Sequence, residues 1–264
     1  MRLTVLTVLL ATAGTPAIAA DPFAPGPSAP IGSDVDLSLR LGLGALVQPD
    51  YEGSDDYHVV PWPIISLEFL RLPGIGEFGG PSSGFSIGPS FNIQGSRKES
   101  DNEALAGLGD VDTAVELGAK MSYETDMFGA FLAVRQGFGG HEGVVGEAGL
   151  NLIMNPTDRL SFIAGPRVSA ASSDFFDTYY SVTPGQAAAS GLPAYDASAG
   201  FKSVGVAAEA IYNLTDLVDL HVEAGWSRLV GDAAGSPIVE RAGSKDQFTV
   251  GAGLSYRLDL NLFD

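Results

Sequence analysis

The chain has 264 residues, contains no cysteine and carries a formal net charge of −18. Phosphate backbones repel a chain this acidic, so the composition excludes nucleic acid as a partner. Without cysteine, an exported chain of this length is held together by hydrogen bonds and packing and not by disulfides. No linker-like stretch divides residues 21–264, which we interpret as one domain.

Residues 1–20 have the layout of a secretory signal peptide. Met1-Arg2 provides a short cationic start, residues 3–10 are mostly apolar, and residues 17–20 are small enough for cleavage. A Pro-rich segment at 21–34 follows, and we expect it to lie in the periplasm. Nowhere further along does the chain hold the roughly 18 apolar residues that a spanning helix needs. The sequence therefore predicts export without a helical membrane anchor.

The first strand of the mature chain is predicted at 35–47, where apolar residues such as Leu41 and Leu43 alternate with polar or small ones such as Arg40 and Gly42. Successive side chains of a strand point to opposite faces, so one face is apolar throughout and the other is not. Similar runs follow at 59–69, 84–95, 111–124, 127–138, 143–154, 159–170, 200–212, 218–230 and 249–262. Ten is an even number, as single-chain bacterial barrels require. A further hairpin within 171–199 would make twelve.

The connections between these strands alternate in length. Tight turns are predicted at 125–126, 155–158 and 213–217, and long segments at 48–58, 96–110, 171–199 and 231–246. Outer-membrane barrels have short periplasmic turns and longer outer loops, so both termini are expected in the periplasm. Two connections depart from this rule, because 70–82 is long for an inner turn and 139–142 is short for an outer loop.

Charged residues concentrate on the face opposite the apolar row, where they avoid the cost of facing lipid. The sequence therefore predicts an all-β fold, a closed antiparallel transmembrane β-barrel with charges in its lumen. Ten strands leave a narrow interior, which disfavours a general porin. The charges form either a paired network or a selective conduit. The lumen charges that we single out are Arg40, Glu116, Lys120, Arg135, Glu147, Arg167, Glu223 and Arg257.

An enzymatic role finds little support in the sequence, so we predict no catalytic residue and no enzyme. His221 lies on the inner face, yet residues two apart on one strand face are about 7 Å apart, which is too far for a nucleophile and its base. No phosphate-binding loop and no metal-spaced Cys or His cluster is present, so no cofactor is predicted. The acidic segment 48–58 is interpreted as a hydrated turn, with a calcium site or divalent-cation contact to lipopolysaccharide as the alternatives.

Three segments resemble the MipA/OmpV family, the MltA-interacting proteins of the Gram-negative outer membrane. The first has a Pro-x-Tyr-x-Gly-Ser-Asp pattern with a nearby Pro-x-Pro, the second is rich in Tyr and ends in Ser-Gly-Leu-Pro-x-Tyr, and the third reads Gly-Asp-Ala-Ala-x-Ser-Pro-Ile-Val. The residues that carry these motifs are Pro49, Tyr51, Gly53, Ser54, Asp55, Tyr57, Pro61 and Pro63, then Tyr179, Ser190, Gly191, Leu192, Pro193 and Tyr195, then Gly231, Asp232, Ser236 and Pro237.

This resemblance implies an outer-membrane location and, for the best-known members, a scaffold that links a lytic transglycosylase to a bifunctional penicillin-binding protein in cell-wall growth. It also implies contact with outer-membrane lipid and lipopolysaccharide. The residues themselves leave a second function class open, a narrow channel for small solutes or ions. A scaffold would use the 70–82 connection or the amino-terminal segment, whereas a channel would use the lumen charges.

Overall fold

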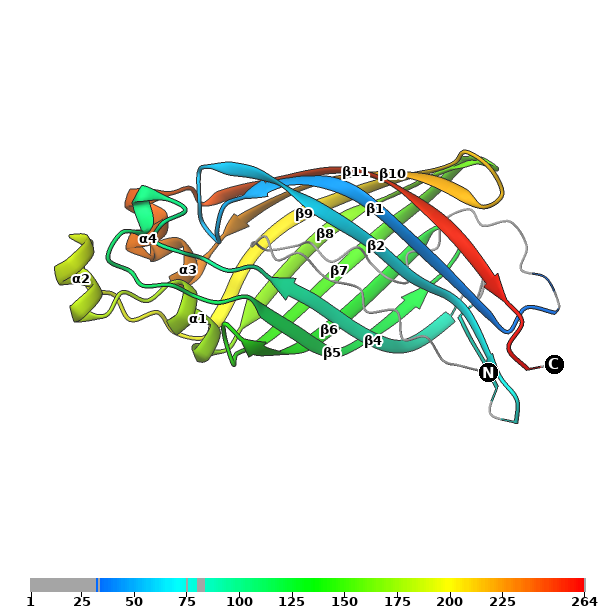
Figure 1. Cartoon of the computed structure of the whole chain (residues 1–264), viewed down its shortest axis with the longest axis horizontal. Coiled ribbons are helices and arrows are strands. Elements are labelled where there is room, and N and C mark those ends of the chain that lie inside the picture. The colour runs from blue at the N-terminus through cyan, green and yellow to red at the C-terminus, as the bar shows by residue number, and fades with distance from the viewer. Residues whose placement is uncertain (1–31, 33, 75, 80–83, 264) are drawn as a thin grey trace.

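The computed structural model describes residues 32, 34–74, 76–79 and 84–263, so the predicted signal peptide at 1–20 and most of the Pro-rich segment at 21–34 lie outside the described residues. Ten long strands and one short strand make a single antiparallel sheet (Figure 1). The strands are β1 (Leu37–Pro49), β2 (Tyr57–Leu72), β3 (Gly76–Gly79), β4 (Gly84–Gln94), β5 (Ala114–Glu124), β6 (Phe128–Gly139), β7 (Val144–Thr157), β8 (Leu160–Ala171), β9 (Gly200–Asn213), β10 (Val218–Leu229) and β11 (Asp246–Leu260). The ten predicted strands are thus confirmed.

The sheet curls into a half-barrel in which the first and last long strands, β1 and β11, lie side by side. Its hydrogen-bonded order runs from β3 and β2 through β1, β11, β10 and so on down to β4. Within the described residues, no ladder joins β4 to β2 or β3. Proline lacks the N–H that a ladder needs and therefore favours sheet edges. Pro61 and Pro63 lie in the part of β2 that pairs with β1 alone, and Pro89 lies in the edge strand β4.

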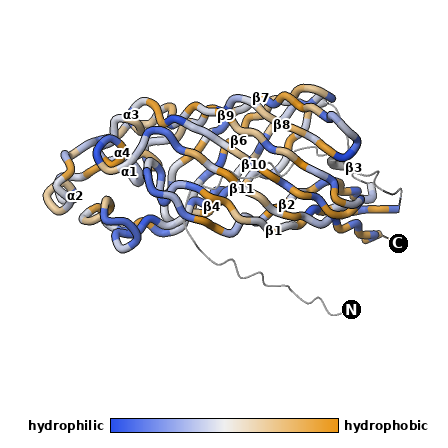
Figure 2. Tube along the Cα trace, turned by 90° about the horizontal axis from the view of Figure 1, so that it is seen from above, coloured by the Kyte–Doolittle hydropathy of each residue, from blue (hydrophilic) through white to orange (hydrophobic). Residues whose placement is uncertain are grey.

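Buried and exposed side chains alternate along the long strands, most regularly along β11, and Figure 2 shows apolar and polar residues alternating along the Cα trace. Leu43 is 65% exposed on the outer face, whereas Arg40 and Arg257 are buried on the inner face. The inner face is not polar throughout, because Leu46 of β1 packs there against Val60, Trp62 and Ile64, which all belong to β2. The inner surface of β2 is therefore an apolar patch, which the simple alternation of the sequence did not predict.

The two ends of the half-barrel differ. One end holds the short turns after β5, β7 and β9 and the described carboxyl end, where Asp36 Oδ2 accepts hydrogen bonds from the Leu262 and Phe263 amides. The other end holds the long connections, which fold into the helices α1 (Ser173–Tyr179), α2 (Pro184–Ser190), α3 (Gly231–Gly235) and α4 (Pro237–Ala242) and the 3₁₀ turn η1 (Glu103–Leu105) (Figure 1).

The possibility of twelve strands is wrong, because the segment after β8 holds α1 and α2 and adds a single isolated bridge between Val182 and Tyr195. Ser172 and Thr183 precede these helices, and Thr183 forms a capping box with Gln186. This capping box, with Pro184 at the start of the helix, explains why α2 forms, whereas Ser172 makes no capping hydrogen bond to α1. None of the described helices is long and apolar enough to cross a membrane.

Candidate functional site

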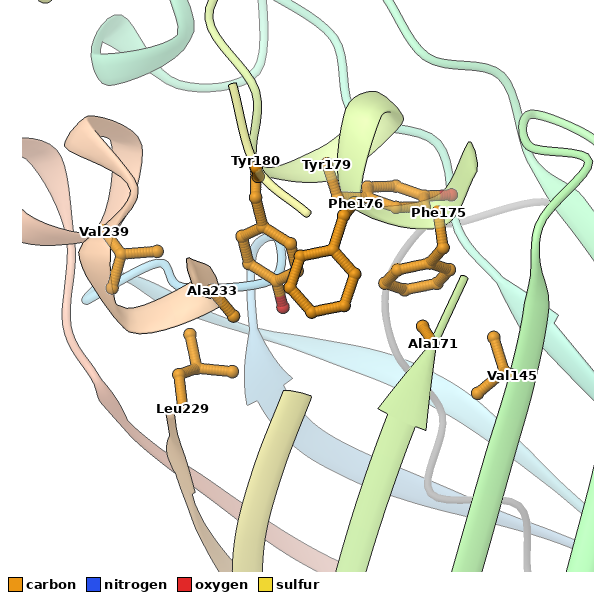
Figure 3. Close-up of a cluster of buried hydrophobic side chains, with 10 residues drawn as sticks. Val145, Ala171, Phe175, Phe176, Tyr179, Tyr180, Leu229, Ala233 and Val239 are labelled. Carbon is orange, nitrogen blue, oxygen red and sulfur yellow. The ribbon is translucent and has the colours of Figure 1, made fainter. Parts of the chain in front are cut away.

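The long connections at one end pack together into a structure that we call the loop cap, made of residues 50–56, 95–113, 140–143, 172–199 and 230–245. Its centre is aromatic: Phe175, Phe176, Tyr179 and Tyr180 are almost completely buried in and just after α1 (Figure 3). The Phe175 and Tyr179 ring centroids lie 4.6 Å apart, and those of Phe176 and Tyr180 lie 5.3 Å apart. Ala233 and Val239 of α3 and α4 complete this cluster from the side of the third motif.

A second apolar cluster joins the three motif segments directly. Tyr51 from the first, Val182 from the second and Ile238 from the third are buried together with Leu105 and Leu108. Tyr195 packs against both clusters. Segments that lie more than 180 residues apart in the chain therefore share one core at the end of the barrel.

Hydrogen bonds fix the motif residues to one another. The Tyr51 hydroxyl donates to the Ala242 carbonyl at 2.8 Å, and the Ser236 hydroxyl donates to the Tyr180 carbonyl at 2.6 Å. The Tyr195 hydroxyl donates to the Asp232 carbonyl at 3.1 Å. Gly53 has a positive φ of 94°, and its amide donates to Gln247 Oε1 at 3.1 Å. The motif residues in the loops therefore have a structural role in assembling the cap.

The remaining motif residues lie at several places in the structure, and Leu192 among them packs against the second cluster. Pro61 and Pro63 are exposed on the outer face of β2, and Tyr57 is exposed at its start. Ser190, Gly191, Leu192 and Pro193 form the end of α2, where Gly191 adopts the left-handed conformation (φ 77°) that ends a helix. Pro49 ends β1, Ser54 and Asp55 belong to the turn after it, and Gly231 and Pro237 begin α3 and α4.

A charged link between the cap and the sheet involves residues that were not among the predicted site residues. Lys202 Nζ of β9 lies 2.6 Å from Glu52 Oε1, and Tyr180 donates a hydrogen bond to the same carboxylate. Burial raises the pKa of the Tyr180 hydroxyl well above its ordinary value. Arg97 donates to the carbonyls of Tyr179 (2.9 Å) and Thr178 (3.2 Å), and burial lowers the pKa of its guanidinium. Lys202 and Arg97 stand outside the three motifs, and Glu52 occupies a variable position of the first, so no local pattern marked these contacts.

Beneath the cap, the inner-face charges form a paired network. Arg135 Nε donates to Glu116 Oε2 at 3.0 Å, and Arg135 Nη2 donates to Glu147 Oε2 at 3.2 Å. His141 Nε2 lies 3.3 Å from Glu116 Oε1, which connects this network to the aromatic centre, because the His141 ring is 4.9 Å from that of Phe175. Lys120 and Arg167 lie over the Phe131 ring at 4.6 and 5.1 Å.

A second network lies nearer the other end. Arg40 pairs with Glu68 at 2.5 Å and with Asp219, and Arg257 Nε lies 3.2 Å from Asp259. Glu223 is buried on the inner face, and its Oε1 has no hydrogen-bond partner among the described residues. All eight charges singled out in the sequence thus lie on the inner face, most of them in pairs.

His221 has partners that the sequence analysis did not foresee. Its Nε2 lies 2.8 Å from Ser255 Oγ of β11, and its Nδ1 lies 3.0 Å from Glu209 Oε1 of β9. A serine, a base and an orienting carboxylate in this order resemble a hydrolase triad. The prediction that no nucleophile lies within reach of His221 is wrong, because Ser255 comes from the neighbouring strand β11. Ser255 is only 2% exposed, however, and the Trp62 ring packs edge-on against His221, so the group forms a buried hydrogen-bonded chain.

Hydrogen bonds hold the acidic segment 48–58 in a fixed conformation at the end of β1. Asp50 Oδ1 lies 2.7 Å from His58 Nδ1, and Asn102 Nδ2 lies 3.4 Å from Asp50 Oδ2 and 3.1 Å from Asp56 Oδ2. Across the part of the chain that the structure describes, no three His, Asp or Glu residues are grouped so that they could hold a metal ion.

The chain matches one protein-family model and is similar to several solved structures. A model of the family "MltA-interacting protein MipA" matches residues 41–258. No curated protein matches the chain. Similar solved structures include the outer membrane proteins OprD (15% identity, 69% of this chain and 50% of that chain, TM-score 0.34) and OprG (15%, 86% and 97%, 0.29), both of Pseudomonas aeruginosa. The NanC porin matches with 10% identity over 84% of this chain and 100% of that chain, with a TM-score of 0.39.

The chain spans half the length of OprD. The matched family is one of outer-membrane proteins, which gives the location of the chain as the outer membrane. No enzymatic family is indicated.

Proposed function

Because the chain belongs to the family of MltA-interacting proteins, we propose that it is an outer-membrane scaffold that holds a murein lytic transglycosylase next to a bifunctional penicillin-binding protein. The family name supports the first partner. The observation that supports a docking site is the β2–β3 hairpin, which extends from the end of the half-barrel where the other connections are short turns (Figure 1).

The base of this hairpin is anchored to the sheet. Phe69 is buried, the Arg71 guanidinium lies 5.4 Å from the centroid of its ring, and Arg71 Nη1 lies 3.8 Å from Asp36 Oδ1. Beyond this anchor, Pro73 and Gly74 are exposed at the turn. With both termini in the periplasm, the exposed hairpin faces the compartment in which murein enzymes work.

The proposal is tested with purified partners. The full chain in detergent micelles is immobilised, and binding of a purified lytic transglycosylase and a penicillin-binding protein is measured by surface plasmon resonance. Replacing residues 73–79 with a two-residue Asn-Gly turn is expected to weaken binding at least tenfold. The matched control replaces Pro184–Ser190 of α2, at the opposite end, with a seven-residue Gly/Ser linker and leaves binding unchanged. Equal partner binding by the parent chain, the hairpin variant and the α2 variant would show that the hairpin is not the docking site.

Three finer features of the molecule belong to the same proposal. Residues 1–20 are a signal peptide that is removed on export, and 21–264 form one barrel domain.

In the membrane the half-barrel closes by bringing β4 against β2 and β3, because an open sheet edge in lipid leaves backbone groups unpaired. Single cysteines placed on β2 and β4 of this cysteine-free chain should cross-link in vesicles if it closes. The apolar outer face contacts lipid, and the acidic cap contacts lipopolysaccharide.

A narrow channel is the alternative, supported by the rows of charges on the inner face. The ion pairs of Arg135 and Arg40 join neighbouring strands across that face, and the cap packs over its end. We therefore expect no measurable conductance when the protein is inserted in a planar bilayer. A steady conductance that changes when Arg135 and Arg167 are replaced would favour the channel instead.

A further inference from the structure

The free edges of the sheet, residues 57–65 of β2 and 84–91 of β4, face each other across a gap that we call the seam. Successive residues of a strand direct their N–H and C=O groups to opposite neighbours. Pro61 and Pro63 are aligned with residues of β1, and Pro89 is aligned with a residue of β5. Because proline has no N–H, these alignments cannot be hydrogen-bonded pairs. The backbone nitrogens of all three prolines therefore point into the seam.

The two edges are in phase for pairing. Beyond the seam, β2 pairs with β3 in a register that sets Phe69 opposite Gly79. Carried on into β4, this register sets a proline of one strand opposite another residue in three successive pairs: Pro63 with Phe85, Pro61 with Ile87, and Pro89 with Val59. Val59, Phe85 and Ile87 are all exposed on the outer face. Each pair would therefore exchange one hydrogen bond, where an ordinary pair of this kind exchanges two.

Inside the sheet, the absence of a proline donor is compensated at Pro166 of β8. This residue lies in a break of the β7–β8 ladder, next to the pair of Gly149 with Arg167. Arg167 Nη1 donates to the Leu150 carbonyl at 2.8 Å in this break, so a side chain replaces the donor that Pro166 lacks. At the seam, the inward Ser86 of β4 donates to Ser122 of β5 and not across the gap.

We propose that the seam is a lateral gate, which pairs weakly when the half-barrel closes and parts toward the lipid while the other ladders stay paired. The gate rests on the closure proposed above. Unpaired backbone groups are costly in lipid, which favours a closed seam. Three carbonyls, those of Val59, Phe85 and Ile87, would lack a donor even then, so closure gains less here than along a complete ladder. Since the cap packs over one end, an open seam would give the lumen an entrance from the membrane.

The gate is tested by electron paramagnetic resonance on the full chain in lipid vesicles, with nitroxide labels on introduced cysteines. Val59→Cys with Ile87→Cys spans the seam. Leu43→Cys with Leu254→Cys is the matched control, because these exposed residues lie opposite each other in the β1–β11 ladder. We expect a short and a long distance across the seam and a single short distance in the control.

The distances separate the gate from the closure on which it rests. A single short distance across the seam would overturn the gate and leave the closure standing. A single long distance would show that the barrel does not close there, and would overturn both.

Proline replacements test the cause of the weakness. Pro61→Val, Pro63→Val and Pro89→Val each restore one N–H, and each should lower the ratio of open to closed molecules about 2- to 10-fold, as one added hydrogen bond does. Pro166→Val is the matched control, because Arg167 already replaces its donor, and should leave the ratio unchanged. Heat-modifiable gel mobility establishes that each variant is folded, and three separate variants keep the test valid if one does not fold. An unchanged ratio in the folded seam variants would overturn the proposal.

Discussion

The inner face of the sheet and the loop cap bury opposite kinds of side chain. The inner face buries Arg135 with Glu116 and Arg40 with Glu68, while apolar residues such as Leu43 are exposed on the outside. The cap buries Phe175, Phe176 and other apolar residues and exposes acids such as Asp55 and Glu99. The sheet is thus polar inside and apolar outside, whereas the cap is apolar inside and polar outside.

The difference follows from the solvent around each half. Lipid surrounds the strands, so apolar side chains gain nothing by facing inward, and charges avoid lipid by pairing inside. Water surrounds the cap, so burial of its aromatic side chains is favourable there. Damage to the ion pairs should therefore weaken the strands, and damage to the aromatic cluster should weaken the cap alone.

The largest effect is expected from Arg135→Met. This change leaves the carboxylates of Glu116 and Glu147 side by side without their cation, and should lower the free energy of unfolding by about 3–5 kcal/mol. Urea unfolding in lipid vesicles, followed by tryptophan fluorescence, measures it. Adding Glu116→Gln and Glu147→Gln to the same chain should restore part of the loss. A single variant as stable as the parent would show that the network is dispensable.

Phe175→Ala should have an effect of similar size that stays within the cap. The side chain is fully buried and contacts His141, Tyr179 and Lys202, so its removal should cost about 3–5 kcal/mol of cap stability. Hydrogen exchange of 172–199 should accelerate while that of the strands stays slow. Phe85→Ala, on the exposed outer face, is the control and should leave exchange in the cap unchanged. Accelerated exchange in the strands as well would mean that the two halves unfold together.

Leu43→Arg tests the outer face at the middle of β1. A charged side chain at this depth should cost about 2–4 kcal/mol in lipid vesicles. Leu43→Ala, which adds no charge, should cost less. If the arginine variant is as stable as the alanine variant, this face does not contact the centre of the bilayer.

Tyr51→Phe should have the smallest effect at neutral pH. It removes the hydrogen bond to the Ala242 carbonyl, worth about 0.5–1.5 kcal/mol to the cap. Burial raises the pKa of Tyr51 from 10.0 to about 12, so the protonated hydroxyl stabilises the cap below pH 10, and this contribution is lost as the pH rises through 12. Near-ultraviolet circular dichroism should show the parent loosening more than Tyr51→Phe between pH 10 and 12. Identical pH profiles would contradict this assignment.

Much of the sheet could be predicted from short-range patterns. The alternation of Leu39, Leu41 and Leu43 with Arg40 and its neighbours sets both the strand and its outer face, because the side chains of a strand alternate whatever its partners are. Prediction failed where a neighbouring element decides the outcome. Trp62 points to the inner face, as the alternation predicts. That face was expected to be polar, but it is apolar around Trp62 because Leu46 and Ile64 pack beside it.

The candidate site was predicted as three motifs without their mutual placement. Nothing local to Glu52 indicates that its partner is Lys202, 150 residues away, and the serine beside His221 comes from a neighbouring strand. Likewise, the segment 171–199 forms helices and not a hairpin, because Phe175 and Tyr179 are buried in the cap rather than turned toward lipid.

The sequence by itself determined the ten strands, the apolar outer side of the sheet and the family to which the chain belongs, because each depends on the periodicity or motifs of contiguous residues. Only the tertiary structure decided how the loops close over one end, how the inner charges pair and which strands lie at the edges of the sheet. Those features depend on contacts between distant residues, and such contacts exist only once the sheet has brought the strands together.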